Sequence, residues 1–80
     1  MQVKNWRERT ISSLSESLGP VSELLVDSAY ETLDPSTNPA EPFGYTRFLR
    51  ALYSELPQDV DRKAVCDALC RQMLGTVLPW

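Results

Sequence analysis

The sequence predicts an all-α fold, a compact bundle of four short helices that forms a single domain over residues 1–80. Apolar residues recur every three or four positions through most of the chain, which is the spacing of one face of an α-helix. Glycines and prolines interrupt this spacing at Gly19, Pro20, Pro57 and Gly75, where helices are expected to end or begin. The alternating pattern of a strand is missing from the sequence, and so is an internal repeat.

The first two helices are expected at residues 3–18 and 20–33, with a corner between them. The apolar face of the first contains Val3, Trp6, Ile11, Leu14 and Leu18. Arg7 falls on the same face, so we expect its stem to lie along the apolar surface and its guanidinium to stay in water. Gly19 suits the end of one helix and Pro20 the first turn of the next, because proline has no N–H to leave unpaired there.

The last two helices are expected at residues 45–56 and 60–74, after a proline-rich loop at residues 34–44. Pro57 stops the first of this pair, because proline cannot continue a helix. Asp59 has the side chain of an N-cap, and we expect it to begin the last helix. Two pairs of helices joined by a long loop therefore complete the predicted bundle.

The chain ends in an apolar tail, residues 75–80, which contains Val77, Leu78 and Trp80. If these side chains are exposed, they form an apolar patch of the kind that marks a contact surface. The pattern leaves two alternatives open, in which the tail packs on its own bundle or on another chain.

Composition excludes several classes of function. The net charge is −3, and the six acids between Ser15 and Pro42 have no basic residue among them, so we expect no nucleic-acid partner. The sequence lacks histidine, the commonest metal ligand and general base, so we expect no enzyme and no cofactor. Apolar stretches are too short for a membrane span or a signal peptide, which predicts a cytoplasmic protein with reduced thiols.

Cys66 and Cys70 are four residues apart on the expected last helix. At that spacing their Cβ atoms lie about 5–6 Å apart, which is too far for a disulfide within an intact helix. Both fall on the apolar face with Leu69 and Met73, so we expect two buried thiols. The alternative is a thiol-responsive or ligand-responsive regulator in which both cysteines are exposed.

Glu23, Asp27 and Glu31 form an acidic ladder along the outer face of the expected second helix. Such a ladder is usually a solvated face. The alternative is a docking surface, which binds either a basic partner or Arg47 and Arg50 of a neighbouring helix.

Basic residues gather in the second half of the chain, where a short connection, "PQD", joins two helices. A helix-turn-helix DNA reader also uses a short connection of this kind. The basic residues are Arg47, Arg50, Arg62, Lys63 and Arg71. Acidic residues alternate with them, namely Asp59, Asp61 and Asp67, so DNA binding is the less favoured alternative.

Two stretches are similar to a small all-helical interaction module found at the C-terminal ends of bacterial signalling proteins, including serine/threonine kinases. The first is "LGPVSELLVDSA", with Leu18, Gly19, Pro20, Leu25, Val26 and Ala29. The second is "LYSELPQDVDRKAVCDAL", with Leu56, Pro57, Arg62 and Leu69. The resemblance implies a non-catalytic interaction or oligomerisation module, and it supplies no catalytic residues.

The sequence thus predicts a protein that works by contact with another protein or with itself, as a homodimer. The core of so short a chain supplies only about 3–5 kcal/mol of net folding stability. This small margin favours burial of further apolar surface against a partner. The expected contact residues are Glu23, Asp27, Glu31, Val77, Leu78 and Trp80.

Overall fold

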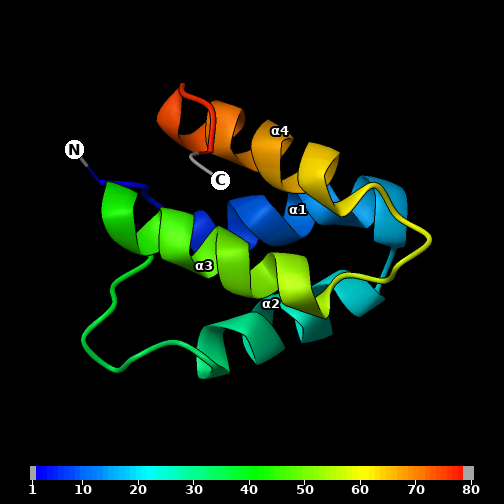
Figure 1. Ribbon diagram of the computed structural model, residues 1–80, viewed down its shortest axis with the longest axis horizontal. Helices are drawn as coiled ribbons and strands as arrows, with labels where there is room; N and C mark the ends of the chain where they lie inside the picture. Colours follow the sequence, from blue (N-terminus) through cyan, green and yellow to red (C-terminus); the bar gives the residue numbers. More distant parts are fainter. Residues whose placement is uncertain (1, 79–80) are drawn as a thin grey trace.

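The computed structural model describes residues 2–78, and this part of the chain is an all-α bundle without strands (Figure 1). Its helices are α1 (Trp6–Leu18), α2 (Val21–Glu31), α3 (Pro42–Glu55) and α4 (Arg62–Leu74). Consecutive helices run in opposite directions and pack side by side, and α4 returns to contact α1. The predicted fold class is confirmed. Within residues 2–78 no helix has both the length and the apolar character needed to cross a membrane.

The first helix begins at Trp6, three residues later than predicted. Val3 lies outside it, yet this side chain is only 1% exposed, and its backbone N–H donates to the carbonyl of Ala40 at 2.6 Å. Asn5 adopts a left-handed conformation with φ of 54°, which asparagine tolerates better than most residues. The chain therefore turns at Asn5, and Val3 reaches the core from a segment bonded to the loop before α3.

The predicted corner at Gly19 and Pro20 is confirmed. Gly19 has a positive φ of 67°, and its N–H donates to the carbonyl of Ser15 at 3.1 Å, which ends α1. The helix after the corner is shorter than residues 20–33 at both ends, because Pro20 is its N-cap, Val21 its first residue and Glu31 its last. Leu33 still packs at the edge of the core from the loop.

The long loop ends earlier than predicted, because α3 begins at Pro42 instead of residue 45. Proline suits this first turn, because its missing N–H would have no partner there. Gly44 follows, and its Cα lies so close to the backbone of Asn38 that a Cβ would overlap the Asn38 carbonyl. A glycine is therefore required where the loop folds back against the first turn of α3.

The last helix begins at Arg62 instead of residue 60, and its N-cap is Asp61 instead of Asp59. The Asp61 side chain accepts a hydrogen bond from the backbone N–H of Ala64 at 3.1 Å, which satisfies a donor of the first turn. Gly75 ends the helix in a left-handed conformation, with φ of 73°.

The core lies where the inner faces of the four helices meet. Trp6 of α1 packs edge-on against Phe48 of α3, with ring centroids 5.0 Å apart. Beside them the hydroxyls of Thr10 and Tyr45 lie 2.8 Å apart, in a fully buried hydrogen bond. Because α1 and α3 face each other across the bundle, these contacts hold both helix pairs together.

Candidate partner-binding surfaces

The acidic ladder of α2 is partly used inside the molecule. Arg7 donates from Nε and Nη2 to the two carboxylate oxygens of Asp27, each at 2.9 Å, and from Nη2 to Glu23 at 3.3 Å. The hydrogen bonds from Arg7 hold the pKa of Asp27 below its ordinary value. The Arg7 side chain is still 43% exposed, so its guanidinium stays in contact with water, as expected, while it binds the ladder. Asp27 pairs with Arg7 of α1 and not with Arg47 or Arg50, the neighbours that the sequence suggested. Glu23 and Asp27 of the ladder thus join α2 to α1.

Glu31, the last member of the ladder, is exposed and forms no ion pair with any residue of the described part of the chain. It lies at the C-terminal end of α2, where a negative charge is not favoured by the helix dipole. Of the three ladder residues, Glu31 is the one whose charge is left for a partner.

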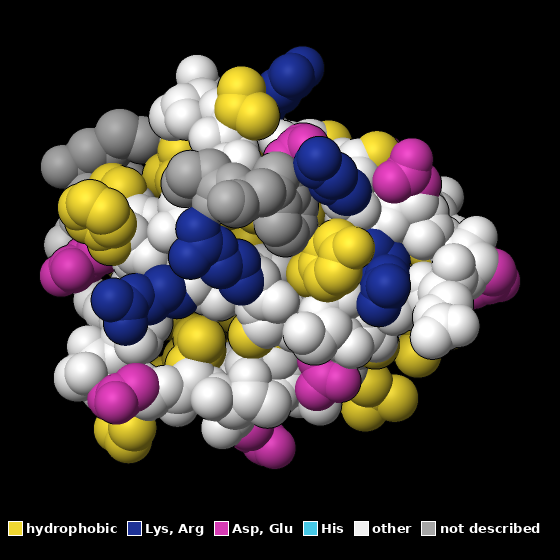
Figure 2. All heavy atoms as spheres, in the orientation of Figure 1, with side chains coloured by type: hydrophobic (Ala, Val, Ile, Leu, Met, Phe, Trp, Pro, Cys, Tyr) yellow, Lys and Arg dark blue, Asp and Glu magenta, His cyan; other side chains and the backbone are white. Residues whose placement is uncertain are grey.

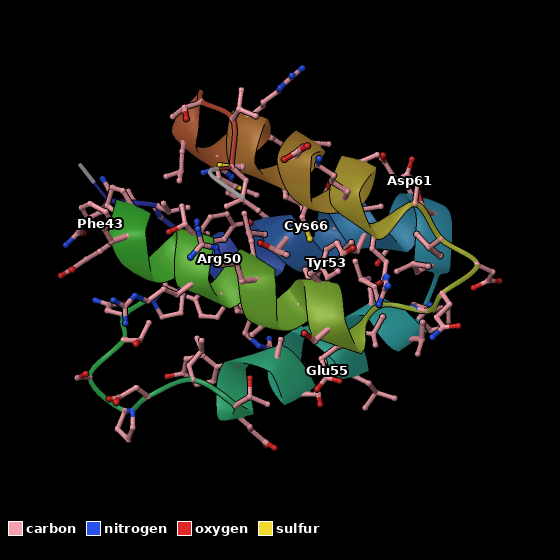
Figure 3. All side chains as sticks on the ribbon, viewed as in Figure 1. Phe43, Arg50, Tyr53, Glu55, Asp61 and Cys66 are labelled. Carbon is pink, nitrogen blue, oxygen red and sulfur yellow. The ribbon has the colours of Figure 1, made fainter. Side chains whose placement is uncertain are left out.

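Both cysteines are buried and unpaired, as the sequence predicts. Cys66 points into the bundle, where its Sγ contacts the carbonyl oxygen of Leu49 at 3.4 Å (Figure 3). Burial raises the pKa of Cys66 to about 12, and burial also raises the pKa of Cys70. Because the thiolate is the reactive form, neither residue has the exposure that the alternative of a thiol-responsive regulator requires.

The apolar tail packs on its own bundle as far as it is described. Leu78 is only 2% exposed and belongs to the core, so its predicted role as a contact residue is wrong. Val77 is 54% exposed and remains at the surface. Trp80, the third predicted contact residue of the tail, lies outside the described residues.

The helices α3 and α4 do not form the helix-turn-helix arrangement that the sequence left open. They lie side by side in opposite directions, and residues 56–61 connect them (Figure 1). A helix-turn-helix has a shorter turn and crosses its helices at about 90–120°. Arg62 is moreover stacked on Tyr53, with its guanidinium carbon 4.6 Å from the ring centroid.

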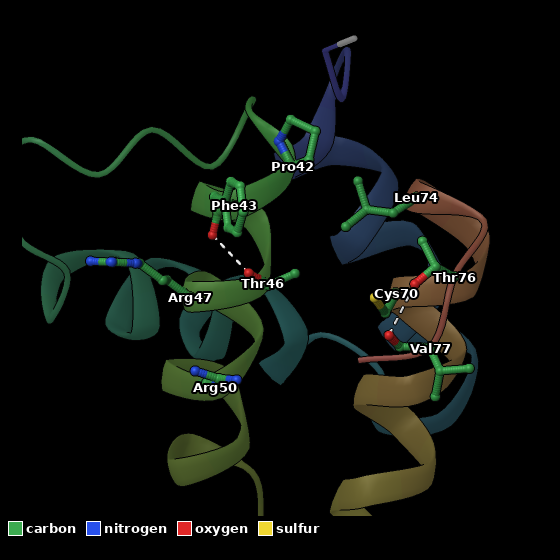
Figure 4. Close-up of a pocket in the computed structure, with 9 residues that line it drawn as sticks. All are labelled: Pro42, Phe43, Thr46, Arg47, Arg50, Cys70, Leu74, Thr76 and Val77. Atoms are coloured by element: carbon green, nitrogen blue, oxygen red, sulfur yellow. Dashed lines mark hydrogen bonds between the residues drawn. The ribbon is translucent and has the colours of Figure 1, made fainter. Parts of the chain in front are cut away.

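A groove that the sequence did not reveal lies between the first half of α3 and the end of α4. Its volume is about 660 Å³. Figure 4 shows α3 side chains on one wall, with Cys70, Leu74 and Val77 on the other. We call this feature the α3–α4 groove. The sequence did not predict this groove, because residue 43 was expected in a loop and not in the first turn of α3.

Phe43 lies at the mouth of the groove and is 86% exposed. It points outward from the N-terminal end of α3 (Figure 3). Helical periodicity identifies apolar residues that face the core, and Phe43 was expected in the loop before the helix. Phe43 was therefore not predicted as a contact residue. The available signal was an aromatic residue in the "EPFG" stretch, where a polar loop was expected.

Basic side chains flank the groove. Arg47, one helical turn after Phe43, extends away from α4, and Arg50 follows one turn later on α3 (Figure 4). Both are exposed. In the view of Figure 2, blue side chains cross the middle of this face while acidic ones lie mainly near its border. The groove thus combines an apolar mouth with positive charge.

A second apolar surface lies on the outer side of α2. Leu24 is 69% exposed and Val21, three residues before it, is 41% exposed. Glu31 is seven residues after Leu24, so it falls on the same side of the helix. We call Val21, Leu24 and Glu31 the α2 ridge. It combines apolar side chains with negative charge, the reverse of the groove.

Neither surface contains the donor set of a metal centre. No group of three or more Cys, Asp or Glu side chains within residues 2–78 is arranged to hold a metal ion. Comparisons with known protein families, with curated proteins and with solved structures found no match. The geometry of the two surfaces is therefore the basis for a functional proposal.

Proposed function

We propose that this protein is a non-catalytic interaction module, which binds an apolar side chain of a partner protein in the α3–α4 groove. The observation that carries the proposal is the exposure of Phe43, at 86%, beside Val77, at 54%, on the same groove. Large apolar side chains that gather at a hollow of the surface mark contact sites, because their removal from water favours association.

The charges near the groove favour an acidic partner segment. Arg47 and Arg50 lie along α3 beside the groove, where a carboxylate of the partner would gain a favourable interaction. The segment with the best fit is an amphipathic helix or a short peptide with one large apolar residue between acids. Of the six contact residues predicted from the sequence, the proposal keeps Val77 and adds Phe43 and Arg47.

A binding role is favoured over catalysis by the chemistry of the chain. The sequence contains no histidine, and burial keeps both thiols protonated. The two free cysteines suit a reducing compartment, which supports a cytoplasmic setting. A role in bacterial signalling stays a prediction from the resemblance of the Gly19–Pro20 corner and the Pro57 region.

Selection of random 12-residue peptides displayed on phage, against the immobilised full chain, tests the proposal. The Phe43→Ser variant is the control, because a side chain so exposed contributes little to folding. We expect enrichment of peptides with Leu, Phe or Trp between acids, which is lost with Phe43→Ser. Equal enrichment on both proteins, or none on either, would contradict a binding role for the groove.

A further inference from the structure

The groove and the α2 ridge are complementary in chemistry, and both belong to the same chain. The groove offers Phe43 and Val77 with Arg47 beside them, while the ridge offers Leu24 with Glu31 on the same side of its helix. This complementarity reflects the distribution of charge in the sequence, since residues 15–42 contain six acids and no base. Opposite charges around facing apolar surfaces favour and orient association.

Within one molecule the two surfaces cannot meet. In the bundle α3 lies between α2 and α4, and the groove opens on the α4 side of α3 (Figures 1 and 4). Leu24 is exposed on α2, and the buried residues Val26 and Ala29 lie on the opposite side of this helix. Any contact between ridge and groove must therefore join two molecules.

Resting on the proposed function of the groove, we propose that its occupant is the α2 ridge of a second copy of this chain. In this contact Leu24 of one molecule lies against Phe43 and Val77 of the other, while Glu31 approaches Arg47. The surfaces in contact differ, so the association is head to tail, and each molecule keeps one free ridge or groove for another copy.

The contact is weak because it is small. One ridge of a short helix in one groove buries less than the roughly 1,200 Å² of a stable complex. Association should therefore appear at chain concentrations of about 0.1–1 mM and lessen with added salt, since the ionic part of the contact is exposed.

The decisive experiment mixes two full-length variants, each with one disabled surface. Leu24→Lys disables the ridge and Phe43→Glu disables the groove, and both positions are exposed, so circular dichroism should show unchanged helix content. Sedimentation velocity should show a concentration-dependent series for the unsubstituted chain and at least a tenfold weaker association for each variant alone. An equimolar mixture should form a one-to-one dimer that does not grow further, because one intact ridge meets one intact groove.

A charge exchange adds an independent readout. Glu31→Arg and Arg47→Glu should each weaken association, and a mixture of the two variants should restore it, since every contact then joins opposite charges. Glu16→Lys, which makes the same change of charge sign on an exposed position of α1, is the control and should leave association unchanged.

Three results would overturn the inference. The first is a monomer at every concentration up to about 1 mM, the range expected for so small a contact. The second is a mixture of Leu24→Lys and Phe43→Glu that stays monomeric. The third is association that appears only after removal of residues 79–80, which would assign the groove to the end of its own chain. Peptide enrichment on the groove together with any of these results would leave the proposed function intact.

Discussion

The hydroxyl groups of Thr10 and Tyr45 meet at 2.8 Å in the centre of the bundle, and both residues are 0% exposed. Each hydroxyl is the polar partner of the other, and they come from α1 and α3, which are 35 residues apart at this contact. A buried polar group without a partner is unfavourable, so this pair selects the arrangement in which these two helices face each other.

Removal of one hydroxyl at a time should show this mutual dependence. Thr10→Val leaves the Tyr45 hydroxyl without its partner and should reduce the free energy of unfolding by about 1–3 kcal/mol. Tyr45→Phe should also reduce the free energy of unfolding. The loss in the double variant should be smaller than the sum of the losses in the two single variants, because the double variant leaves no hydroxyl unpaired. Urea denaturation of the four proteins gives the coupling, and additive effects would contradict it.

Substitution of Gly44 should be much more destabilising than substitution of Gly75. A Cβ at Gly44 overlaps the backbone of Asn38, which cannot move without displacing the loop, so Gly44→Ala should lower stability by about 3 kcal/mol. A Cβ at Gly75 would meet open space, so Gly75→Ala is destabilised only by the left-handed backbone conformation. This conformation should lower stability by about 1–2 kcal/mol. Thermal denaturation ranks the two variants, and equal midpoints would contradict the close approach at Gly44.

The ion pair between Arg7 and Asp27 should make stability depend on acid pH. The Asp27 pKa is lower in the folded state than its ordinary value of 3.8, so its contribution is complete above that value. It is lost as the pH falls through the lowered pKa. Asp27→Asn should therefore be less stable than the unsubstituted chain near pH 7, with a difference that shrinks towards pH 2. Denaturation across this range checks it, with Glu16→Gln as the exposed control.

The buried thiols should resist modification in the folded protein. Because Cys66 and Cys70 are at most 1% exposed, a disulfide reagent should react slowly with the native chain and rapidly with both thiols in denaturant. The rate in native buffer should follow the fraction of open molecules. Fast reaction of both thiols without denaturant would show that the inner face of α4 is not packed as described.

Alkaline pH should destabilise the fold through Cys66 and Tyr45. Burial raises the pKa of each to about 12, from ordinary values of 9.0 and 10.0. The unfolded chain thus releases these protons first, and stability is complete below about pH 9 and falls as the pH rises towards 12. Cys66→Ala should show a shallower decrease over this range, measured as the free energy of unfolding against pH.

Sequence reasoning worked where local chemistry decides the outcome. Gly19 and Pro20 carry their own conformational preferences, so the corner between α1 and α2 was predictable before any packing was known. Gly75 likewise ends α4 through its own conformational preference. The burial of Cys66 was predictable from its place on the apolar face of α4. Apolar periodicity, summed over a helix, is likewise a local signal of which face is inside.

Helix starts were less predictable, because competing candidates lie close together in the sequence. Asp59 and Asp61 have the same capping side chain, and only the path of the chain after Leu56 decides that Asp61 accepts the bond from Ala64. Val3 fits the periodicity of α1, yet its hydrogen bond to Ala40 removes it from the helix. This bond joins residues that are far apart in the sequence, whereas periodicity describes only the spacing of residues within one segment.

The sequence by itself determined the helical class, the corner at Gly19 and the apolar inner faces, because these follow from backbone preferences and from spacing along one segment. Tertiary structure alone decided that Arg7 pairs with Asp27, that Leu78 is buried and that Phe43 stands at the mouth of a groove. Each of these depends on which helix lies beside which, and that is settled by the packing of all four together.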